Sequence, residues 1–318
     1  MSLAFVFPGQ GSQVPGMGRD LSAAFPIARE TFQEVDDALG QKLSRLIFEG
    51  PAEELTLTAN AQPALMAVST ALTRVLAKEG GFDLGRQVAL VAGHSLGEYS
   101  ALTAAGAFDL ATAARLLRRR GEAMQDAVPP GEGAMAALLG AEAAQALEVC
   151  AAAAEAPDGT REVVELANDN GGGQVVVSGA RAAVERAIEA AKALGIKRAM
   201  LLPVSAPFHC SMMAPAADAM RDALGRAAMQ VPAVPVVANA SAAPVSDPEA
   251  IRDLLVRQVT GTVRWRECVA AMVAAGCTRF VEVGAGRVLT GLMKRNAPEA
   301  QASALGTPAE VEAFLRSL

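Results

Sequence analysis

The sequence predicts an α/β protein in which a large domain with a parallel sheet is interrupted by a smaller second domain. Two observations lead to this fold class. Short apolar runs that end in glycine-rich turns alternate with longer segments of helical periodicity, as buried parallel strands and their connecting helices do. In the middle of the chain the order of the elements changes, which indicates the second domain.

The first part of the chain supplies two strands of the large domain. Residues 3–7 form an apolar run that ends in PGQGSQVPGMG, and residues 87–92 form another that ends in GHSLG. The apolar periodicity between and after these runs predicts helices over residues 63–78 and 110–124. Because this alternation is typical of parallel sheets, we expect both strands to be buried in one.

From residue 134 the predicted order becomes β-α-β-β-α-β, which is the order of the ferredoxin-like unit. The expected strands are 134–139, 162–166, 174–178 and 199–204, and the expected helices are a segment that ends at 154 and residues 181–194. Turn-rich segments precede and follow this unit. We therefore expect a ferredoxin-like (βαββαβ) subdomain at 131–202, inserted into a discontinuous α/β catalytic domain made of residues 1–130 and 203–318.

The α/β pattern returns after the insertion. Residues 234–238 and 279–283 are expected to form strands, and residues 248–259 a helix. The run GAGRVL after the last of these strands hints at a dinucleotide-binding turn, but Leu289 stands where that motif has its third glycine. Close packing of a helix on a strand is the better interpretation.

Composition and charge exclude several classes of function. Apolar residues make up 52% of the 318 residues, which excludes a disordered chain, and the net charge of −6 has the wrong sign for a general nucleic-acid-binding protein. Four cysteines without metal-ligand spacing favour buried thiols in a reducing compartment. The amino terminus does not resemble a secretory signal, and no segment has the length and hydropathy of a membrane span. We expect a cytoplasmic protein without a metal.

Gly93-His94-Ser95-Leu96-Gly97 matches G-x-S-x-G, the nucleophile elbow of α/β-hydrolase-like domains. In this motif a serine sits on a strained turn between a strand and a helix, and small flanking residues let the backbone bend tightly. The match lies after a predicted strand and before a predicted helix, as the motif requires. Ser95 is therefore the candidate nucleophile. The alternative is a serine that only caps the following helix.

A serine nucleophile needs a base, and the sequence contains two histidines. His94 precedes Ser95 on the same turn, where neighbouring side chains diverge, so we interpret it as a packing residue. His209, in the proline-containing stretch SAPFHC, is the candidate base by elimination. No acidic residue lies near His209 in the sequence, so the group that orients its imidazole stays open.

Backbone N–H groups beside the nucleophile can stabilise a negatively charged oxygen. The loop of residues 8–13 follows the first strand, and we expect its N–H groups to meet the elbow and form half of an oxyanion hole. The N–H of Leu96 would be the other half. A phosphate-binding loop at residues 11–18 is the rival interpretation. It fails because Met17 and Gly18 replace the lysine and the hydroxyl residue that such a loop needs.

Two polar side chains fall on apolar helix faces. Arg120 lies on the stripe of residues 110, 113, 117 and 124, whereas Arg118 and Arg119 point elsewhere and complement the helix dipole. An inward arginine needs an anion, and a planar guanidinium matches a substrate carboxylate. Gln258 shares a face with Ile251 and Leu255, so its amide must find partners in the core, either for packing or for support of the site.

Five segments occur in order over nearly the whole chain: FVFPGQGSQ, GHSLGEYSAL, RRRGEAMQ, SAPFHCSMM and VEVGAGRVLTGL. Together they resemble the malonyl-CoA:acyl-carrier-protein transacylases, the acyltransferases of fatty-acid and polyketide synthesis. The resemblance includes the inserted ferredoxin-like subdomain. It implies transfer of a malonyl group from malonyl-CoA to the phosphopantetheine thiol of an acyl carrier protein, through a malonyl ester of serine and with no cofactor besides the coenzyme A thioester.

The resemblance also implies roles for single residues. The set consists of Ser95 as nucleophile, His209 as base, Arg120 on the malonyl carboxylate, the backbone N–H groups of Gln10 and Leu96 as oxyanion hole, and Gln258, whose main-chain carbonyl supports His209. Phe208 resembles the residue of malonyl-selective members, where a ring would crowd an α-methyl branch. Asn168 resembles a position near the coenzyme.

Two other classes of function stay open. A serine hydrolase or thioesterase of α/β type would share Ser95 and His209, but it would admit water and would have no need for Arg120. A module that only binds a carrier protein or coenzyme would have no reason to hold a strained serine. Because carrier proteins are typically acidic, a local basic patch is expected in the transacylase. The candidates for it are Lys192, Lys197, Arg198 and the arginines near Arg120.

Overall fold

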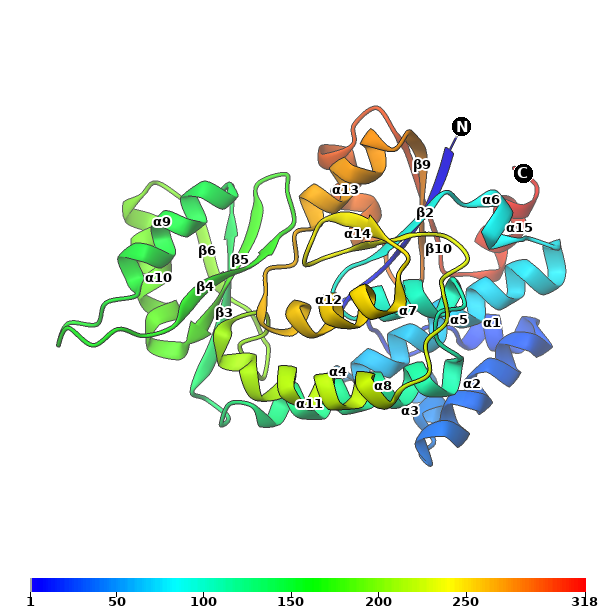
Figure 1. Cartoon of the computed structure of the whole chain (residues 1–318), viewed down its shortest axis with the longest axis horizontal. Coiled ribbons are helices and arrows are strands. Elements are labelled where there is room, and N and C mark those ends of the chain that lie inside the picture. The colour runs from blue at the N-terminus through cyan, green and yellow to red at the C-terminus, as the bar shows by residue number, and fades with distance from the viewer. Residues whose placement is uncertain (1) are drawn as a thin grey trace.

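The computed structural model describes residues 2–318 and contains two separate sheets (Figure 1). The larger has the strand order β10-β9-β1-β2-β7-β8, in which β8 runs antiparallel to β7 and the other strands are parallel. Its strands are β1 Ser2–Phe7, β2 Leu90–Gly93, β7 Val236–Ala238, β8 Ala243–Val245, β9 Cys277–Val283 and β10 Gln301–Leu305. The predicted α/β architecture with a largely parallel sheet is confirmed.

Helices connect the strands of this sheet and cover both of its faces. They are α1 Arg19–Ala24, α2 Pro26–Leu39, α3 Leu43–Glu49, α4 Ala52–Thr56, α5 Thr58–Gly80, α6 Leu84–Gln87, α7 Gly97–Ala104, α8 Leu110–Asp126, α11 Ala214–Arg226, α12 Pro248–Thr260, α13 Trp265–Ala274, α14 Val288–Asn296 and α15 Pro308–Leu315. A 3₁₀ turn, Ser211–Met213, precedes α11. The sequence analysis predicted α5, α8 and α12, but not the short helices before α5.

Alternate side chains of β1 face two different layers of helices. Leu3, Phe5 and Phe7 belong to a buried core with residues of α5 and α8, whereas Ala4 and Val6 belong to another with residues of α13 and α14. Successive side chains of a strand point to opposite faces, so both faces of the sheet are covered, as a parallel sheet requires.

The smaller sheet is antiparallel, with the strand order β4-β5-β3-β6. Its elements are β3 Gly133–Leu139, α9 Ala143–Ala153, β4 Val164–Asp169, β5 Gln174–Ala180, α10 Arg181–Ala193 and β6 Arg198–Leu201. The predicted β-α-β-β-α-β order is therefore present. The two helices cover a core that includes Leu138 and Val177, while Met135 and Val176 belong to a core of the larger sheet.

Several strand predictions need correction at their ends. The strands expected at 162–166 and 234–238 are β4, Val164–Asp169, and β7, Val236–Ala238. The strand expected at 87–92 begins only at Leu90, because the preceding residues form α6 and the N–H of Val88 bonds back to the carbonyl of Leu84 (3.0 Å). The strand expected at 199–204 ends at Leu201. Pro203 has no N–H group to donate to a ladder, which favours an early end.

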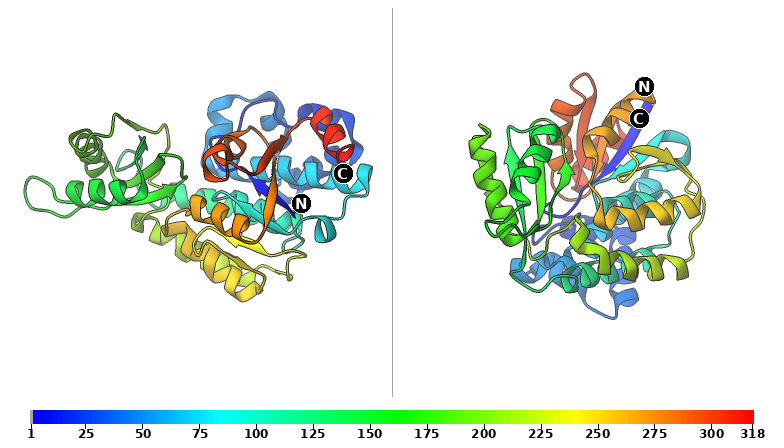
Figure 2. Two further views of the ribbon diagram at one scale, coloured as in Figure 1. Left: turned by 90° about the horizontal axis from the view of Figure 1, so that it is seen from above. Right: turned by 60° about the vertical axis from the view of Figure 1, so that its left-hand side comes forward.

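Hydrogen bonds join one edge of β4 to the segment between α12 and α13. The N–H of Val263 donates to the carbonyl of Ala167 (2.8 Å), and the N–H of Asp169 donates to the carbonyl of Val263 (3.0 Å). The Thr262 hydroxyl donates to the carbonyl of Leu166 (2.6 Å). Figure 2 shows the smaller sheet with its helices beside the bulk of the molecule. The edge of β4 is thus anchored to the segment that connects α12 with α13.

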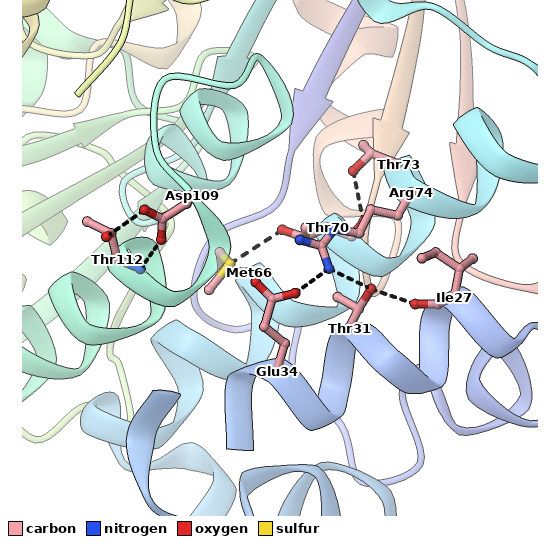
Figure 3. A network of polar contacts seen from close by, with 9 residues as sticks. All are labelled: Ile27, Thr31, Glu34, Met66, Thr70, Thr73, Arg74, Asp109 and Thr112. Atoms are coloured by element: carbon pink, nitrogen blue, oxygen red, sulfur yellow. Dashed lines mark hydrogen bonds and ion pairs between the residues drawn. The ribbon is translucent and has the colours of Figure 1, made fainter. Parts of the chain in front are cut away.

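The long helix α5 is tied to α2 by polar contacts (Figure 3). The guanidinium of Arg74 donates to Glu34 (2.6 Å) and to the hydroxyl of Thr31 (3.4 Å), which itself donates to the carbonyl of Ile27 (2.7 Å). Figure 3 also shows the start of α8, where Asp109 accepts a hydrogen bond from the N–H of Thr112 (2.7 Å). This cap fixes the start of the helix that carries Arg120.

The segment between β9 and α14 is held by contacts within the protein, which agrees with the packing interpretation of GAGRVL. The carboxylate of Glu282, fully buried, accepts hydrogen bonds from the N–H groups of Leu289 (3.1 Å) and Thr290 (2.7 Å) and from the Thr290 hydroxyl (2.7 Å). The helix N-terminus that would meet a pyrophosphate is thus occupied by a side chain of the protein. A Cβ at Gly284 would lie 2.6 Å from Pro8, so this glycine permits close packing, as expected.

Among the described residues, 2–318, no helix combines the length and the apolar character that crossing a lipid bilayer requires.

Replacing Glu282 by alanine is expected to lower the free energy of unfolding by about 2–3 kcal/mol, because buried donors at the start of α14 lose a charged acceptor. Urea unfolding followed by circular dichroism measures this. The matched control is Glu30→Ala on the exposed face of α2, expected to change stability by less than about 0.5 kcal/mol. Equal losses in the two variants would contradict the capping role of Glu282.

Candidate active site

The predicted site residues meet at a cavity of about 420 Å³ between the two sheets. From the predicted set, its lining includes Ser95, His209, Arg120, Gln10, Leu96, Asn168 and Phe208. Gln258 does not line the cavity but lies directly behind it and is fully buried. The carboxyl ends of β1 and β2 lead into this region, which is where ligands bind in open α/β sheets.

Ser95 has the strained backbone that the elbow motif predicts. Its φ is 53°, in the left-handed region that residues with a side chain rarely adopt. A Cβ at Gly93 would lie 1.9 Å from the carbonyl group of Gly97, and a Cβ at Gly97 would lie 2.3 Å from the carbonyl oxygen of Phe7. Both glycines of the motif are therefore required by close backbone contacts.

The hydroxyl of Ser95 lies 2.8 Å from Nε2 of His209, and Nδ1 of His209 lies 2.9 Å from the main-chain carbonyl oxygen of Gln258. A carbonyl only accepts, so Nδ1 carries the proton and Nε2 is free to accept the proton of the serine. The group that orients the imidazole of His209, which the sequence pattern left open, is thus the main-chain carbonyl of Gln258. His209 has a φ of 61°, a second strained backbone that the sequence did not predict.

Burial and the nearby Arg120 guanidinium lower the pKa of His209 to about 3. The imidazole is therefore neutral at physiological pH, as a general base must be. Nε2 of His94 lies 2.8 Å from Oδ1 of Asn170, and its ring lies beside that of Trp265. His94 also lines the cavity, so its role as a packing residue stays a prediction. Burial also lowers the pKa of His94, so neither histidine adds a positive charge.

Arg120 points inward, as its helix position predicts, and is 1% exposed. Its guanidinium donates to Oε1 of Gln62 (2.8 Å), Oε1 of Gln258 (2.8 Å) and Oγ of Ser95 (3.1 Å). Its Nε has no hydrogen-bond partner within residues 2–318. Because all these partners are neutral, the guanidinium keeps its capacity to bind an anion beside the serine.

The other arginines of α8 lie outside the cavity, as expected. Arg118 donates to Asn60 (2.8 Å) and Gln41 (2.5 Å), and Arg115 and Arg119 are exposed.

Two backbone N–H groups are available beside the serine. Those of Gln10 and Leu96 donate no hydrogen bond to any part of the chain between residues 2 and 318, and both residues line the cavity. The side chain of Gln10 is held by the hydroxyl of Thr58, which donates to its Oε1 (3.0 Å). Free N–H groups at the cavity wall are what an oxyanion hole requires.

Asn168 and Phe208 complete the wall. Asn168 lines the cavity, and its Oδ1 is buried without a hydrogen-bond partner within residues 2–318. Phe208 is 7% exposed and presents apolar surface to the cavity.

Three residues of the site were not found from the sequence. Asn239 accepts from the N–H of Ser95 (2.8 Å) and donates to the carbonyl of Gly93 (2.8 Å), so it holds both sides of the elbow. Gln62 binds Arg120, and Glu98 binds Asn239 and Gln258. Asn239 directly follows β7, whose carboxyl end lies beside that of β2. This position at the carboxyl end of a strand is the one feature of the sequence that could have indicated Asn239.

Within residues 2–318 no group of His, Cys, Asp and Glu side chains is arranged to hold a metal ion, and the four cysteines are free and buried.

Gly97→Ala is expected to destabilise the protein by about 1–3 kcal/mol and to slow the reaction of Ser95 with a fluorophosphonate probe, because the new Cβ must displace the carbonyl of Phe7. Denaturant unfolding and probe labelling measure the two effects. Gly225→Ala is the control: this helical glycine faces open space, and alanine should stabilise by roughly 0.5–1 kcal/mol. Normal labelling of the Gly97 variant would refute the packing argument.

Comparison with known proteins places the chain in a family. A family model described as "Acyl transferase domain" matches residues 4–310. The malonyl CoA-acyl carrier protein transacylase of Escherichia coli (strain K12) is 49% identical over 312 residues, which are 98% of each chain.

The crystal structure of acyl-carrier-protein-S-malonyltransferase from Bartonella henselae has a TM-score of 0.95 and 55% identity, and covers 100% of this chain and 99% of that one. A solved complex of a type II PKS acyl-carrier protein with its malonyl-transacylase matches with a TM-score of 0.94, 44% identity and 100% of both chains. The chain therefore belongs to the acyl transferase family, among the malonyl CoA-acyl carrier protein transacylases.

Proposed function

We propose that this protein transfers the malonyl group of malonyl-CoA to the phosphopantetheine thiol of an acyl carrier protein by a ping-pong mechanism. The observation that carries the proposal is the buried guanidinium of Arg120, 3.1 Å from a serine hydroxyl that itself lies 2.8 Å from a neutral histidine. This arrangement supports a carboxylate-binding group beside an activated nucleophile. The names of the relatives and the solved carrier-protein complex support the same substrates.

In the first half-reaction Oγ of Ser95 attacks the thioester carbonyl of malonyl-CoA, and its proton passes to Nε2 of His209. The C–S bond then breaks, and coenzyme A leaves as a thiol with that proton. In the second half-reaction the phosphopantetheine thiol gives its proton to His209 and attacks the serine ester, and Ser95 regains its hydroxyl. The N–H groups of Gln10 and Leu96 stabilise the carbonyl oxygen, which becomes negatively charged in both halves.

The remaining site residues set position and selectivity. The carbonyl of Gln258 holds the His209 tautomer without placing a charge next to the imidazole. The ring of Phe208 restricts the room beside the malonyl α-carbon, which disfavours methylmalonyl by about 1–3 kcal/mol. Asn168 offers its unpartnered amide to the coenzyme or the carrier arm. No cofactor beyond the coenzyme A thioester enters these steps.

We also infer the finer description of the fold. The order β4-β5-β3-β6 with two helices on one face supports a ferredoxin-like subdomain at 131–202. The elbow between β2 and α7 supports an α/β-hydrolase-like catalytic domain made of residues 1–130 and 203–318. Four free cysteines favour a reducing compartment, so we propose the cytoplasm as the location. The basic patch at Lys192, Lys197 and Arg198 stays a prediction.

Arg120→Ala is expected to reduce kcat/KM for malonyl transfer by about 30-fold to several-thousandfold, the equivalent of about 2–5 kcal/mol, because the malonyl carboxylate loses its charged partner. Transfer of an acetyl group, which has no carboxylate, should be spared or improved. Arg86→Ala, an exposed arginine on α6 that does not line the cavity, is the control and should change neither rate. An equal loss for both acyl groups would count against the carboxylate site.

Ser95→Ala should prevent formation of a malonyl-enzyme, since the ester oxygen is removed. Mass spectrometry of the intact protein after incubation with malonyl-CoA measures the adduct, and the wild-type protein should gain one malonyl group. An adduct on the alanine variant would place the nucleophile elsewhere. Adding a carrier protein separates the functions: malonyl transfer identifies a transacylase, whereas release of free malonate alone would identify a hydrolase.

A further inference from the structure

Arg120 is a buried cation without an adjacent counter-ion. Its three hydrogen-bond partners are neutral, and none of the ion pairs within residues 2–318 includes Arg120. A buried charge of this kind is costly unless a charge of opposite sign lies nearby. A negative charge that compensates Arg120 must therefore act through one intervening side chain.

Glu98, on the first turn of α7, is that group. It is 1% exposed, and one of its carboxylate oxygens accepts from Nε2 of Gln258 (2.9 Å) and from the N–H of Asn239 (2.9 Å). The same amide of Gln258 turns its Oε1 to Arg120 (2.8 Å). A single side-chain amide thus joins the carboxylate of Glu98 to the guanidinium of Arg120.

The carboxylate also determines which way this amide faces. Nε2 of Gln258 donates to Glu98 and to the carbonyl of Ser95 (3.0 Å), and these two acceptors leave Oε1 for the arginine. With the amide reversed, its N–H groups would face the guanidinium and its oxygen would face the carboxylate, a repulsive contact at each end. Glu98 therefore orients the partner that orients Arg120.

We propose that Glu98 is a positioning residue of this site: it is the counter-charge of Arg120 in the empty enzyme, and it binds a proton from solvent when the substrate carboxylate takes its place beside Arg120. Two carboxylates near one buried guanidinium repel one another, and Glu98 is the one that can be neutralised without losing its hydrogen bonds to both donors. The inference rests on the proposed binding of the malonyl carboxylate at Arg120.

The titration properties of the surrounding groups agree with this role. Burial raises the pKa of Glu98 to about 7, although the hydrogen bonds from Asn239 and Gln258 and the charge of Arg120 oppose the shift. The other titratable groups that face it or Arg120 stay neutral. Burial raises the pKa of Tyr99 and of Cys268 and lowers the pKa of His209 and of His94. Glu98 is thus the group whose charge changes near neutral pH.

This predicts a specific pH dependence of binding. Below its pKa Glu98 is already protonated, and a malonyl carboxylate binds without further proton uptake. Above its pKa binding must take up a proton, so affinity for malonyl-CoA falls as pH rises. Coenzyme A without the malonyl group places no charge at Arg120 and should not show this loss.

The test uses the Ser95→Ala protein, which cannot be acylated, and measures Kd for malonyl-CoA and for coenzyme A by calorimetry between about pH 6 and about pH 8. The ratio of the two constants cancels the ionisation of the coenzyme itself. The preference for malonyl-CoA should fall as pH rises, by up to about tenfold in total for each unit by which binding raises the pKa of Glu98.

Adding Glu98→Gln to the Ser95→Ala protein should make the preference independent of pH. The matched control, Glu122→Gln on the exposed face of α8, should leave the pH dependence intact.

The outcomes separate the inference from the proposed function. Equal affinity for malonyl-CoA and coenzyme A at every pH would overturn the carboxylate site and the inference with it. A preference for malonyl-CoA whose pH dependence survives in the Glu98→Gln variant would overturn only the inference, and so would a preference that does not change with pH. A purely structural Glu98 would alter stability or kcat but not this ratio.

A second measurement needs no variant at position 98. Calorimetry in two buffers of different ionisation enthalpy gives the number of protons taken up on binding. At a pH slightly above 7, malonyl-CoA should take up a fraction of a proton more than coenzyme A does. Equal uptake by the two ligands would contradict the proposal, even if the Glu98→Gln protein does not fold.

Discussion

The hydrogen bonds of Gln258 are the constraint on which the candidate site depends. Its main-chain carbonyl holds His209, its Oε1 holds Arg120, and its Nε2 holds the carbonyl of Ser95 and the carboxylate of Glu98. These partners come from different parts of the chain, and α12 must lie within about one hydrogen-bond length of each. The close packing of α12 against its neighbours therefore fixes the distances between Ser95, His209 and Arg120, the proposed nucleophile, base and carboxylate-binding group.

Backbone strain is the second constraint, and Asn239 helps to maintain it. Ser95 and His209 both have a positive φ, which costs about 1–3 kcal/mol per residue and persists only where surrounding contacts demand it. The side chain of Asn239 binds the backbone on both sides of the elbow, and the glycines at 93 and 97 admit no side chain. The strain exposes the serine hydroxyl and brings the imidazole within 2.8 Å of it.

The residues that could be predicted from the sequence are those with a local signal. Ser95 stands in a motif, His209 is one of two histidines, and Arg120 and Gln258 break the apolar periodicity of their helices. Glu98 has no such signal, because α7 is buried on nearly all sides and shows no polar face. Asn239 and Gln62 acquire their roles from residues far away in the sequence. The short helices α1, α3 and α4 have too few apolar positions to define a period, whereas α2 was missed although its buried apolar residues 28, 32 and 35 repeat at helical spacing.

The charge of Arg120 connects selectivity for the acyl group with the protonation of His209. Arg120 and burial together keep the pKa of His209 far below its ordinary value, which ensures a free base but disfavours the imidazolium that forms during acylation. A carboxylate bound to Arg120 offsets the charge that His209 senses, and so lowers the cost of protonating it. An acyl group without a carboxylate leaves that cost in place. The proposed substrate would then improve the base that attacks it, so that recognition of the malonyl carboxylate contributes to the chemical step as well as to binding.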